Sequence, residues 1–300
     1  MSTRHLQGIR VHEDVDLFRE AVSYTAAETG FIARLIEKDY FCTLLLQHTA
    51  TVANAVFKGG TCLAKVHADF YRLSEDLDFA VSVPTDANRR VHRKLAEPLR
   101  RAVEALPAPF RLTVPMEGHS NSTQYRGVVT YPSLLDGHDE PIFLELSLRE
   151  PLLTPAAQAG ARTLLRDPVA AGPMVPAVTV SCIGREEAFA EKFRAALSRR
   201  EVAIRDFFDL DYAVQKLRLP TSDATLVEMV RRKLAIPGND PVNVSTSRLM
   251  QLRGQLDTRL RPVLRAKDFA TFDLDRAFDI AVAMAKAVAI GPTGQTAATA

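Results

Sequence analysis

Two aspartates separated by one residue, Asp76 and Asp78, are the side chains of this 300-residue chain best suited to chemistry. Their alternation with Leu77, Phe79 and Val81 predicts a β-strand, on which residues two apart project from one face about 6 to 7 Å from each other. Carboxylates at that separation suit a hard divalent ion such as Mg²⁺. The pair therefore predicts a metal site, although an Asp-x-Asp also occurs in solvated loops and on edge strands.

A diglycine, Gly59-Gly60, lies one helix-length before the acids. Glycine has no Cβ, so its backbone can approach a ligand closely, and a helix predicted from Thr61 to Tyr71 would direct free N–H groups to the same place. A diglycine before a helix is also common as a simple turn. Lys65, one turn into the helix, either reaches back to a phosphate or lies on the surface. The residues predicted to bind polyphosphate are Lys58, Gly59, Gly60, Thr61 and Lys65.

The combination of a diglycine, one helix and an Asp-x-Asp strand resembles the signature of the nucleotidyltransferase superfamily. The fuller pattern is similar to that of the AbiEii/AbiGii-type toxin family, which includes the MenT toxins. Fifteen residues separate Gly60 from Asp76, a long spacing that also resembles this family. The residues that carry the resemblance are Lys58, Gly59, Gly60, Thr61, Leu63, Lys65, Arg72, Ser74, Glu75, Asp76 and Asp78.

Two later segments strengthen the resemblance. One is a helix with an acid five residues before Lys192, and the other is an Arg-Asp-x-x-Asp-Leu helix that begins at Arg205. The resemblance implies that Lys192 binds the triphosphate, with Arg205 among the nucleotide-binding residues. It implies that Asp209 acts as a base or orients Lys192. Arg205 and Asp209 are also spaced i, i+4 and can pair on one helix face.

A third acid is expected from a neighbouring strand. In the strand predicted at 142–148, Glu145 lies on the face opposite to Ile142, Leu144 and Leu146. A carboxylate in so apolar a strand needs a partner if it is buried, and superfamily members usually bring such an acid to the metal. The alternative is an outward-facing glutamate on a half-exposed strand.

Two further residues have candidate roles near the nucleotide. Ser74 shares a strand face with Asp76, so it either caps a turn or hydrogen-bonds a phosphate. A phosphate group added to Ser74 would repel the acids and the incoming nucleotide, which makes this residue a possible point of control by an antitoxin. Lys38 lies in a Glu-Lys-Asp segment that resembles the family, and the alternative for this segment is a solvent-exposed helix stripe.

Charge and cysteine content limit the protein class. The net charge is +2, but residues 185–270 carry 17 Lys and Arg against 12 Asp and Glu, an excess that suits a polyanion or an ordinary solvated surface. Cys42, Cys62 and Cys182 are scattered, which argues against a disulfide framework and a metal motif and favours a reducing cytosol. His67 has no evident partner and is interpreted as non-catalytic. No segment is long and apolar enough for a membrane span.

The patterns predict an α+β fold with mixed α/β character. We expect a nucleotidyltransferase-type mixed sheet flanked by helices in residues 1–183, and a mostly helical lobe in residues 184–300 that ends in a disordered tail at 291–300. Residues 150–175, rich in Pro, Ala and Gly, are interpreted as the crossing between the two lobes. The zero Trp and six Tyr leave little for base stacking.

The resemblance implies a function as well as a fold. Toxins of this family use an NTP and Mg²⁺ to add nucleotides to the tRNA 3′ acceptor end, which blocks aminoacylation, and a cognate antitoxin neutralises them in the cytoplasm. Two other functions stay open. One is a nucleotidyltransferase that modifies a protein or a small molecule, and the other is an inactive nucleotide- or RNA-binding module.

Overall fold

The structure is a computed structural model that describes residues 10–84, 87–149 and 151–290, and these form two compact units. The first unit extends to Gly184 and also includes Val263–Ala266. The second unit comprises Arg185–Pro262 and the chain from Lys267 onward. The predicted tail at 291–300 lies outside the described residues.

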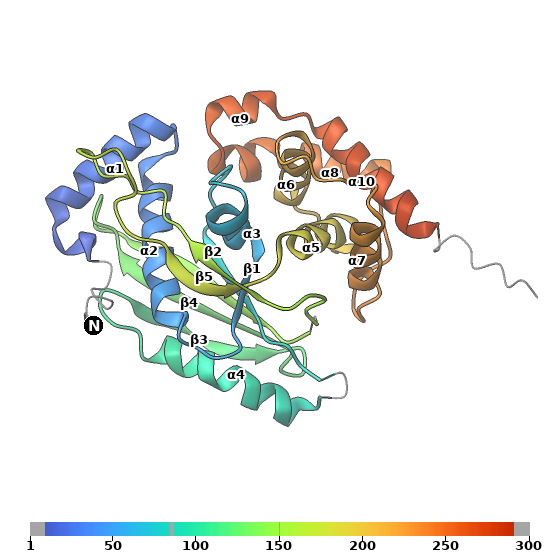
Figure 1. Ribbon diagram of the computed structural model, residues 1–300, viewed down its shortest axis with the longest axis horizontal. Helices are drawn as coiled ribbons and strands as arrows, with labels where there is room; N and C mark the ends of the chain where they lie inside the picture. Colours follow the sequence, from blue (N-terminus) through green and yellow to red (C-terminus); the bar gives the residue numbers. More distant parts are fainter. Residues whose placement is uncertain (1–9, 85–86, 150, 291–300) are drawn as a thin grey trace, which may run out of the picture. The chain divides into compact units, whose positions relative to one another are not determined.

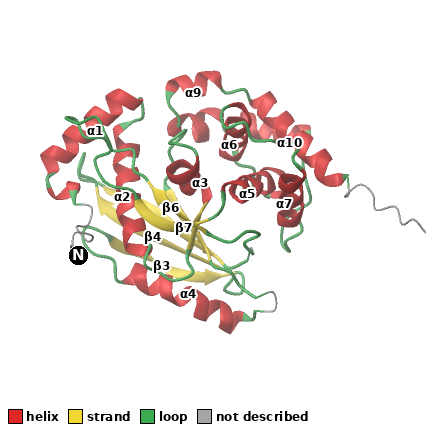
Figure 2. Cartoon of the chain, in the orientation of Figure 1, coloured by secondary structure: helices red, strands yellow, loops and turns green. Residues whose placement is uncertain are grey.

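The first unit is built on a seven-stranded mixed sheet, shown in yellow in Figure 2. The strand order is β3-β4-β5-β2-β1-β7-β6, in which β2 pairs with β5 and β1 with β7 in parallel and the other neighbours are antiparallel. The predicted mixed sheet is therefore confirmed. The strands are β1 Val56–Lys58, β2 Asp76–Ala80, β3 Arg111–His119, β4 Gln124–Pro132, β5 Asp139–Ser147, β6 Ala157–Ala161 and β7 Val178–Cys182.

Strand β6 was not predicted. Residues 157–161 have the sequence Ala-Gln-Ala-Gly-Ala, which has low intrinsic strand propensity. They nevertheless pair with all five residues of β7 in antiparallel register, from Ala157 opposite Cys182 to Ala161 opposite Val178. The interpretation of this segment as a crossing between lobes is wrong, because the segment forms an edge of the sheet.

Helices pack against this sheet, and α2 and α4 lie alongside its strands in Figure 1. The helix α2 is buried almost all round, including Glu37, Lys38 and Asp39, each at most 3% exposed. The interpretation of these three residues as a solvent-exposed stripe is therefore wrong. The helical segments of this unit are a 3-10 turn Val11–Glu13, α1 Val15–Thr29, α2 Ala33–Thr49, α3 Gly59–Cys62, a π-helical segment Leu63–His67 and α4 Arg89–Glu104.

The regular elements among the described residues of the second unit are all helical. The helix α8 ends at Arg253 with Gly254 as its C-cap residue, and a separate π-helical segment begins at Leu256. The segments are α5 Arg185–Ser198, α6 Ile204–Gln215, α7 Ala224–Leu234, α8 Thr246–Arg253, the π-helical segment Leu256–Leu260, a 3-10 turn Arg261–Val263, α9 Ala266–Thr271 and α10 Leu274–Ala289.

Side-chain caps fix where several helices begin. Asn88 accepts hydrogen bonds from the backbone N–H groups of the first turn of α4, and Asp223 does the same for α7. Asp14, Ser245 and Asp273 cap α1, α8 and α10 in the same way. Each cap satisfies N–H groups that have no partner within the helix, which typically contributes about 1 kcal/mol.

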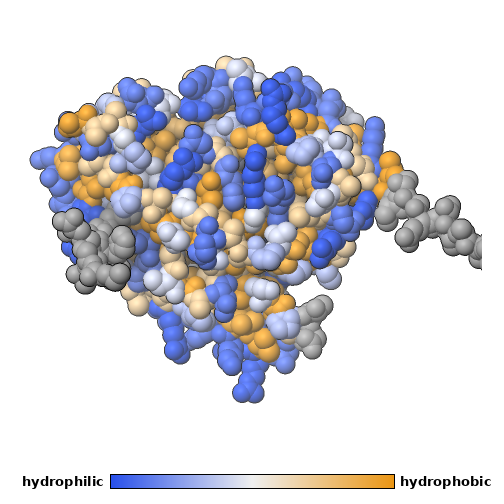
Figure 3. Space-filling model, in the orientation of Figure 1, coloured by the Kyte–Doolittle hydropathy of each residue, from blue (hydrophilic) through white to orange (hydrophobic). Residues whose placement is uncertain are grey.

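Polar side chains, in blue, are interspersed with apolar ones, in orange, over the face seen in Figure 3. Within the part of the chain that the structure describes, the helices are all too short or too polar to cross a membrane.

Candidate active site

A row of charged residues crosses five strands of the sheet. Asp78 on β2 lies opposite Lys58 on β1 and, on its other side, opposite Glu145 on β5. Glu145 lies opposite Arg126 on β4, which in turn lies opposite Glu117 on β3. Paired positions in a sheet present their side chains on one face about 5 Å apart. The strand register thus places Asp78 between a lysine and a second acid.

The third acid lies where the sequence predicts it, next to the aspartates, but it already has partners. Glu145 Oε1 accepts a hydrogen bond from Gln124 Nε2 at 2.7 Å, and Oε2 pairs with Arg126 Nε at 3.2 Å. Among the described residues, Asp76, Asp78 and Glu145 do not form a group of ligand atoms within 4.8 Å of one another. The structure therefore places Glu145 beside Asp78 with both of its carboxylate oxygens already paired.

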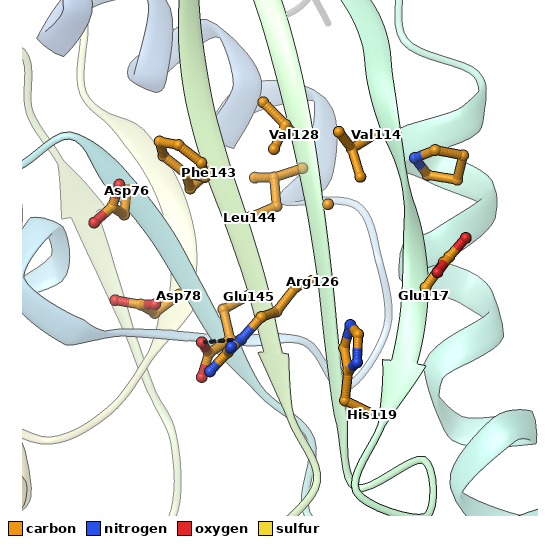
Figure 4. Close-up of a pocket in the computed structure, with 12 residues that line it drawn as sticks. Asp76, Asp78, Val114, Glu117, His119, Arg126, Val128, Phe143, Leu144 and Glu145 are labelled. Carbon is orange, nitrogen blue, oxygen red and sulfur yellow. Dashed lines mark hydrogen bonds and ion pairs between the residues drawn. The ribbon is translucent and has the colours of Figure 1, made fainter. Parts of the chain in front are cut away.

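An apolar row lies beside the charged one. Asp76 is opposite Phe143, Phe143 is opposite Val128, and Val128 is opposite Val114. Phe143 and Val114 are 52% and 47% exposed, unusual for large apolar residues. One cavity of about 370 Å³ is lined by both rows except for Lys58, and Figure 4 shows Asp76 and Asp78 at one side of it. Sequence reasoning missed this apolar row, because Phe143, Val128 and Val114 come together only through the register of three strands.

The diglycine turn meets the acids directly. Gly59 has φ +77°, a conformation that side chains disfavour, and a Cβ placed on it would lie 2.0 Å from Asp78 Oδ2. A Cβ on Gly60 would lie 2.8 Å from Arg72 Nη2 and 3.0 Å from Ser74 Oγ. Neither position has room for a side chain. Asp78, Arg72 and Ser74 can therefore approach the turn closely, as a shared ligand site requires.

Thr61 is oriented toward the acid strand. Its buried hydroxyl donates a hydrogen bond to the backbone carbonyl of Asp76. This bond uses the one hydroxyl proton, so Thr61 ties the start of α3 to β2 rather than donating that proton to a phosphate. The backbone N–H of Thr61 is a separate donor and takes no part in this hydrogen bond.

Lys65 is neither on the surface nor directed at a phosphate in this structure. Its side chain is fully buried, and Nζ lies 2.6 Å from Asp39 Oδ1, 2.9 Å from the Asp39 carbonyl and 2.7 Å from Thr43 Oγ1. An ammonium has three protons, and these acceptors use them. The burial argues against the predicted nucleotide contact and favours a role in joining the helix after the diglycine to α2.

Lys38 lies near β2, where it pairs with the carboxylate of Glu75. Its Nζ is 2.9 Å from Glu75 Oε2, and its side chain is 3% exposed. Glu75 immediately precedes Asp76. Burial acts to raise the pKa of Glu75, but Lys38 and Arg34 outweigh it and hold that pKa below its usual value. The pair therefore joins α2 to the start of β2.

The second unit contains its own buried ion cluster. Lys192 Nζ on α5 lies 2.8 Å from both Asp206 Oδ1 and Asp209 Oδ2 on α6. Burial acts to raise the pKa of Asp206, but Lys192 and Arg199 hold it below its usual value. Among the described residues, no ion pair joins Arg205 to Asp209, so the predicted i, i+4 pair is not formed. Asp209 is 0% exposed and pairs with Lys192 instead.

The first unit thus brings together Lys58, Gly59, Gly60, Ser74, Asp76, Asp78 and Glu145, whereas Lys192, Arg205 and Asp209 belong to the second unit. A mixed sheet with paired acids against a diglycine turn is the arrangement of a nucleotidyltransferase.

Solved structures share the fold. MenT4, a nucleotidyltransferase toxin from Mycobacterium tuberculosis H37Rv, matches with a TM-score of 0.53 at 17% identity, over 94% of this chain and 99% of that one.

A second solved structure, JHP933 from Helicobacter pylori, matches with a TM-score of 0.51 at 16% identity, over 86% of this chain and 93% of that one. No curated protein matches the sequence. The family model of the nucleotidyl transferase AbiEii toxin, of type IV toxin–antitoxin systems, matches residues 44–284. The chain belongs to the AbiEii family of nucleotidyltransferase toxins, as the resemblance predicts.

Proposed function

We propose that the protein uses Mg²⁺ to transfer nucleotides from an NTP to the 3′ acceptor end of tRNA, and so blocks aminoacylation and translation. The observation that carries the proposal is the contact between Asp78 and the diglycine turn, beside a cavity that Asp76 also lines. Metal and polyphosphate can share such a place, because carboxylates bind the ion and a side-chain-free backbone accommodates the phosphates.

The carboxylates fit a divalent cation. Asp78 and Glu145 are directly opposite in register, with Lys58 opposite Asp78 on its other side, and carboxylate oxygens are the ligands that hard divalent cations prefer. Asp76 and Asp78 would hold the ion, and Glu145 would support it while remaining paired with Arg126. When bound, Mg²⁺ supplies charge neutralisation at the phosphates and draws the attacking hydroxyl toward them.

The chain's own residues bind and orient the nucleotide. The backbone at Gly59 and Gly60 contacts the phosphates, and Ser74 Oγ, close to Gly60, donates to them. Lys192 offsets the charge that develops on the leaving pyrophosphate, and Asp209 holds the Lys192 ammonium in position. Both roles of Lys192 and Asp209 rest on the family motif.

The apolar row beside Asp76 suits a nucleotide base. Phe143 exposes an aromatic ring beside Asp76, and Val128 and Val114 continue the surface. Stacking on an aromatic ring binds any base, typically with about 1 to 3 kcal/mol. Although the sequence has no Trp and only six Tyr, this phenylalanine lies where a nucleotide base or the end of an RNA strand would pack.

The acceptor and the partners follow from the family. The family is one of toxin–antitoxin systems, so we propose a cognate antitoxin protein and action in the cytoplasm. The excess of Lys and Arg over Asp and Glu in the second unit gives only weak support for RNA binding, because some of these basic residues are buried within the protein. Lys233 is buried against Glu187 and Glu191, and Arg248 donates to the buried carbonyl of Ala196.

The test is a transfer assay with each α-labelled NTP, Mg²⁺ and total tRNA or cell extract. We expect label on tRNA, and a loss of about 100-fold or more in the Asp78→Asn variant. The matched control is Asp16→Asn, which changes an exposed acid of α1 and should keep wild-type activity.

The same assay distinguishes the other functions. Label on protein or on a small molecule would show a different acceptor for the same chemistry. Nucleotide binding without any transfer would show an inactive binding module and overturn the proposal.

A further inference from the structure

Three potential metal ligands converge away from the aspartates. One ligand atom each from Cys62, His67 and Cys182 lies within 4.8 Å of the other two, and this is the one group of three such side chains found among the described residues. Both cysteines are fully buried, and His67 is half-buried. Neither cysteine is in a disulfide. The predictions that the cysteines form no metal motif and that His67 lacks partners do not anticipate this cluster.

The local backbone explains why Cys62 and His67 meet. Five residues along an α-helix, at 3.6 residues per turn, leave two side chains about 140° apart around the axis. Here Leu63–His67 is π-helical, and the N–H of Ala68 bonds to the carbonyl of Leu63 at 2.8 Å. This wider turn brings residues five apart close to one side, and π-helical turns are frequent at functional sites.

The third ligand comes from the sheet. Cys182 lies on β7, which pairs in parallel with β1 with Phe57 opposite Cys182. Strand β1 leads into the diglycine turn, and α3 carries Cys62 at its end. The cluster therefore joins β7 to the helix that begins at Gly59, three residues before Cys62.

The ring of His67 is already oriented as metal-bound histidines are. Its Nε2 lies 2.9 Å from the carbonyl of Ile183, and a carbonyl can only accept, so Nε2 donates its proton there. In the neutral ring, Nδ1 then keeps its lone pair for a ligand. Metal-binding histidines almost always donate their other N–H in this way, to a backbone carbonyl or a carboxylate.

We propose that Cys62, His67 and Cys182 form a zinc site in this protein, distinct from the magnesium site at the aspartates. Two thiolates and an imidazole are the donor set that Zn²⁺ prefers, whereas Mg²⁺ prefers oxygen ligands. With Zn–S bonds of about 2.3 Å, a tetrahedral site needs ligand atoms about 3.5 to 4 Å apart, and the three ligand atoms here lie within 4.8 Å of one another. A water molecule completes the four ligands, and binding releases both thiol protons to solvent.

The site would act on the active centre through the backbone. A metal that joins β7 to the end of α3 restricts the segment between Gly59 and Cys62, and Gly59 is in contact with Asp78. The bound ion is therefore expected to raise the melting temperature and to hold the diglycine turn in place. Neither effect requires that the zinc contact the nucleotide.

The experiment titrates the full chain, stripped of metal under reducing conditions, with Co²⁺ and then Zn²⁺. We expect one Co²⁺ per chain with thiolate-to-cobalt charge-transfer absorption and tetrahedral visible bands, which Zn²⁺ then abolishes. Protein purified without chelator should contain zinc by elemental analysis. Because the readout is metal binding, it is independent of whether the protein transfers nucleotides.

Variants assign the ligands. Cys62→Ser and Cys182→Ser should each abolish the charge-transfer band or weaken Co²⁺ binding by about 10-fold or more. Cys42→Ala is the matched control, because Cys42 lies outside the cluster and burial raises the pKa of its thiol to about 12. Circular dichroism confirms that each variant is folded, and the wild-type titration needs no variant.

Three results would overturn the proposal. The first is wild-type apoprotein with no thiolate-to-cobalt band. The second is a band that survives in the folded Cys62→Ser variant. The third is a Cys62–Cys182 disulfide, trapped by alkylation in protein taken from cells, with no bound zinc; this would identify the pair as redox-active instead.

Discussion

Individual residues in this site are constrained by close contact rather than by charge alone. Gly59 illustrates this best, because it combines a positive φ with direct contact to the Asp78 carboxylate. Any side chain at this position must both accept an unfavourable backbone conformation and displace a proposed metal ligand. The two effects can be separated, because Gly137 has nearly the same φ, +80°, with nothing within 4 Å of an added Cβ.

We predict that Gly59→Ala lowers transfer by about 100-fold, because a displacement of Asp78 by about 1 Å is enough to lose that much. Gly137→Ala should keep wild-type activity, since both variants share only the backbone cost of about 1 to 2 kcal/mol. The measurements are kcat/KM and the urea midpoint of each variant. An equal loss of activity in both variants would mean that the contact with Asp78 is irrelevant.

Buried ion pairs join helices within each unit. Lys65, in the π-helical segment, pairs with Asp39 of α2, and the remaining Asp39 oxygen accepts from Thr163 Oγ1 and the Leu164 N–H, both at 2.8 Å. In the second unit, Lys192 of α5 pairs with Asp206 and Asp209 of α6. Such pairs specify which elements pack together, because a mispaired arrangement would leave a charge buried alone.

For the first pair we predict a strong dependence of stability on both partners. Lys65→Met should lower the unfolding free energy by about 3 to 5 kcal/mol, because it leaves the Asp39 carboxylate buried without its cation. Adding Asp39→Asn should recover part of that loss, with a coupling energy of about 1 to 3 kcal/mol. Urea unfolding of the two single variants and the double variant measures it. Additive losses would contradict a specific pair.

For the second cluster we predict a pH dependence. The folded-state pKa of Asp206 lies below its ordinary value of 3.8, because Lys192 and Arg199 outweigh the effect of burial. Its ionised form therefore stabilises the fold above pH 3.8, and this contribution is lost as the pH falls from 3.8 through the lowered pKa. Asp206→Asn should consequently destabilise most near neutral pH, and its difference from wild type should shrink in acid.

Urea unfolding at a series of pH values checks this. Asp279→Asn, an exposed acid of α10, is the control and should remain close to wild type at every pH. A difference between Asp206→Asn and wild type that is constant from neutral pH to pH 3 would contradict a lowered pKa.

The molecule as a whole divides its proposed machinery between two units. The acids and the diglycine turn belong to the first, and Lys192 with its aspartates belongs to the second. A family model that covers residues 44–284 includes parts of both. We propose, on the family motif, that transfer depends on residues of both units.

We predict that Lys192→Met lowers kcat/KM for the NTP by about 100-fold, because a cation that stabilises the developing phosphate charge is lost. The control is Lys216→Met, an exposed lysine next to α6 that should have no effect. Because Lys192→Met also removes the cation that pairs with both Asp206 and Asp209, circular dichroism and nucleotide affinity are measured alongside. A folded Lys192→Met variant with wild-type kcat/KM would remove Lys192 from the mechanism.

The mixed α/β class, the acid pair on a strand and the face of Glu145 were all readable from the amino-acid order, because they depend on local periodicity and on motif spacing. The edge strand β6 was not, since its pairing with β7 overrides a weak strand propensity.

Long-range contacts decided the rest. The burial of Lys65, the charged row through Asp78 and the meeting of Cys62 with Cys182 all depend on which segments pack together. A charged or cysteine side chain reads the same in the sequence whether it is exposed or buried. Only the packing around such a side chain determines whether it contacts water, forms an ion pair or binds a metal.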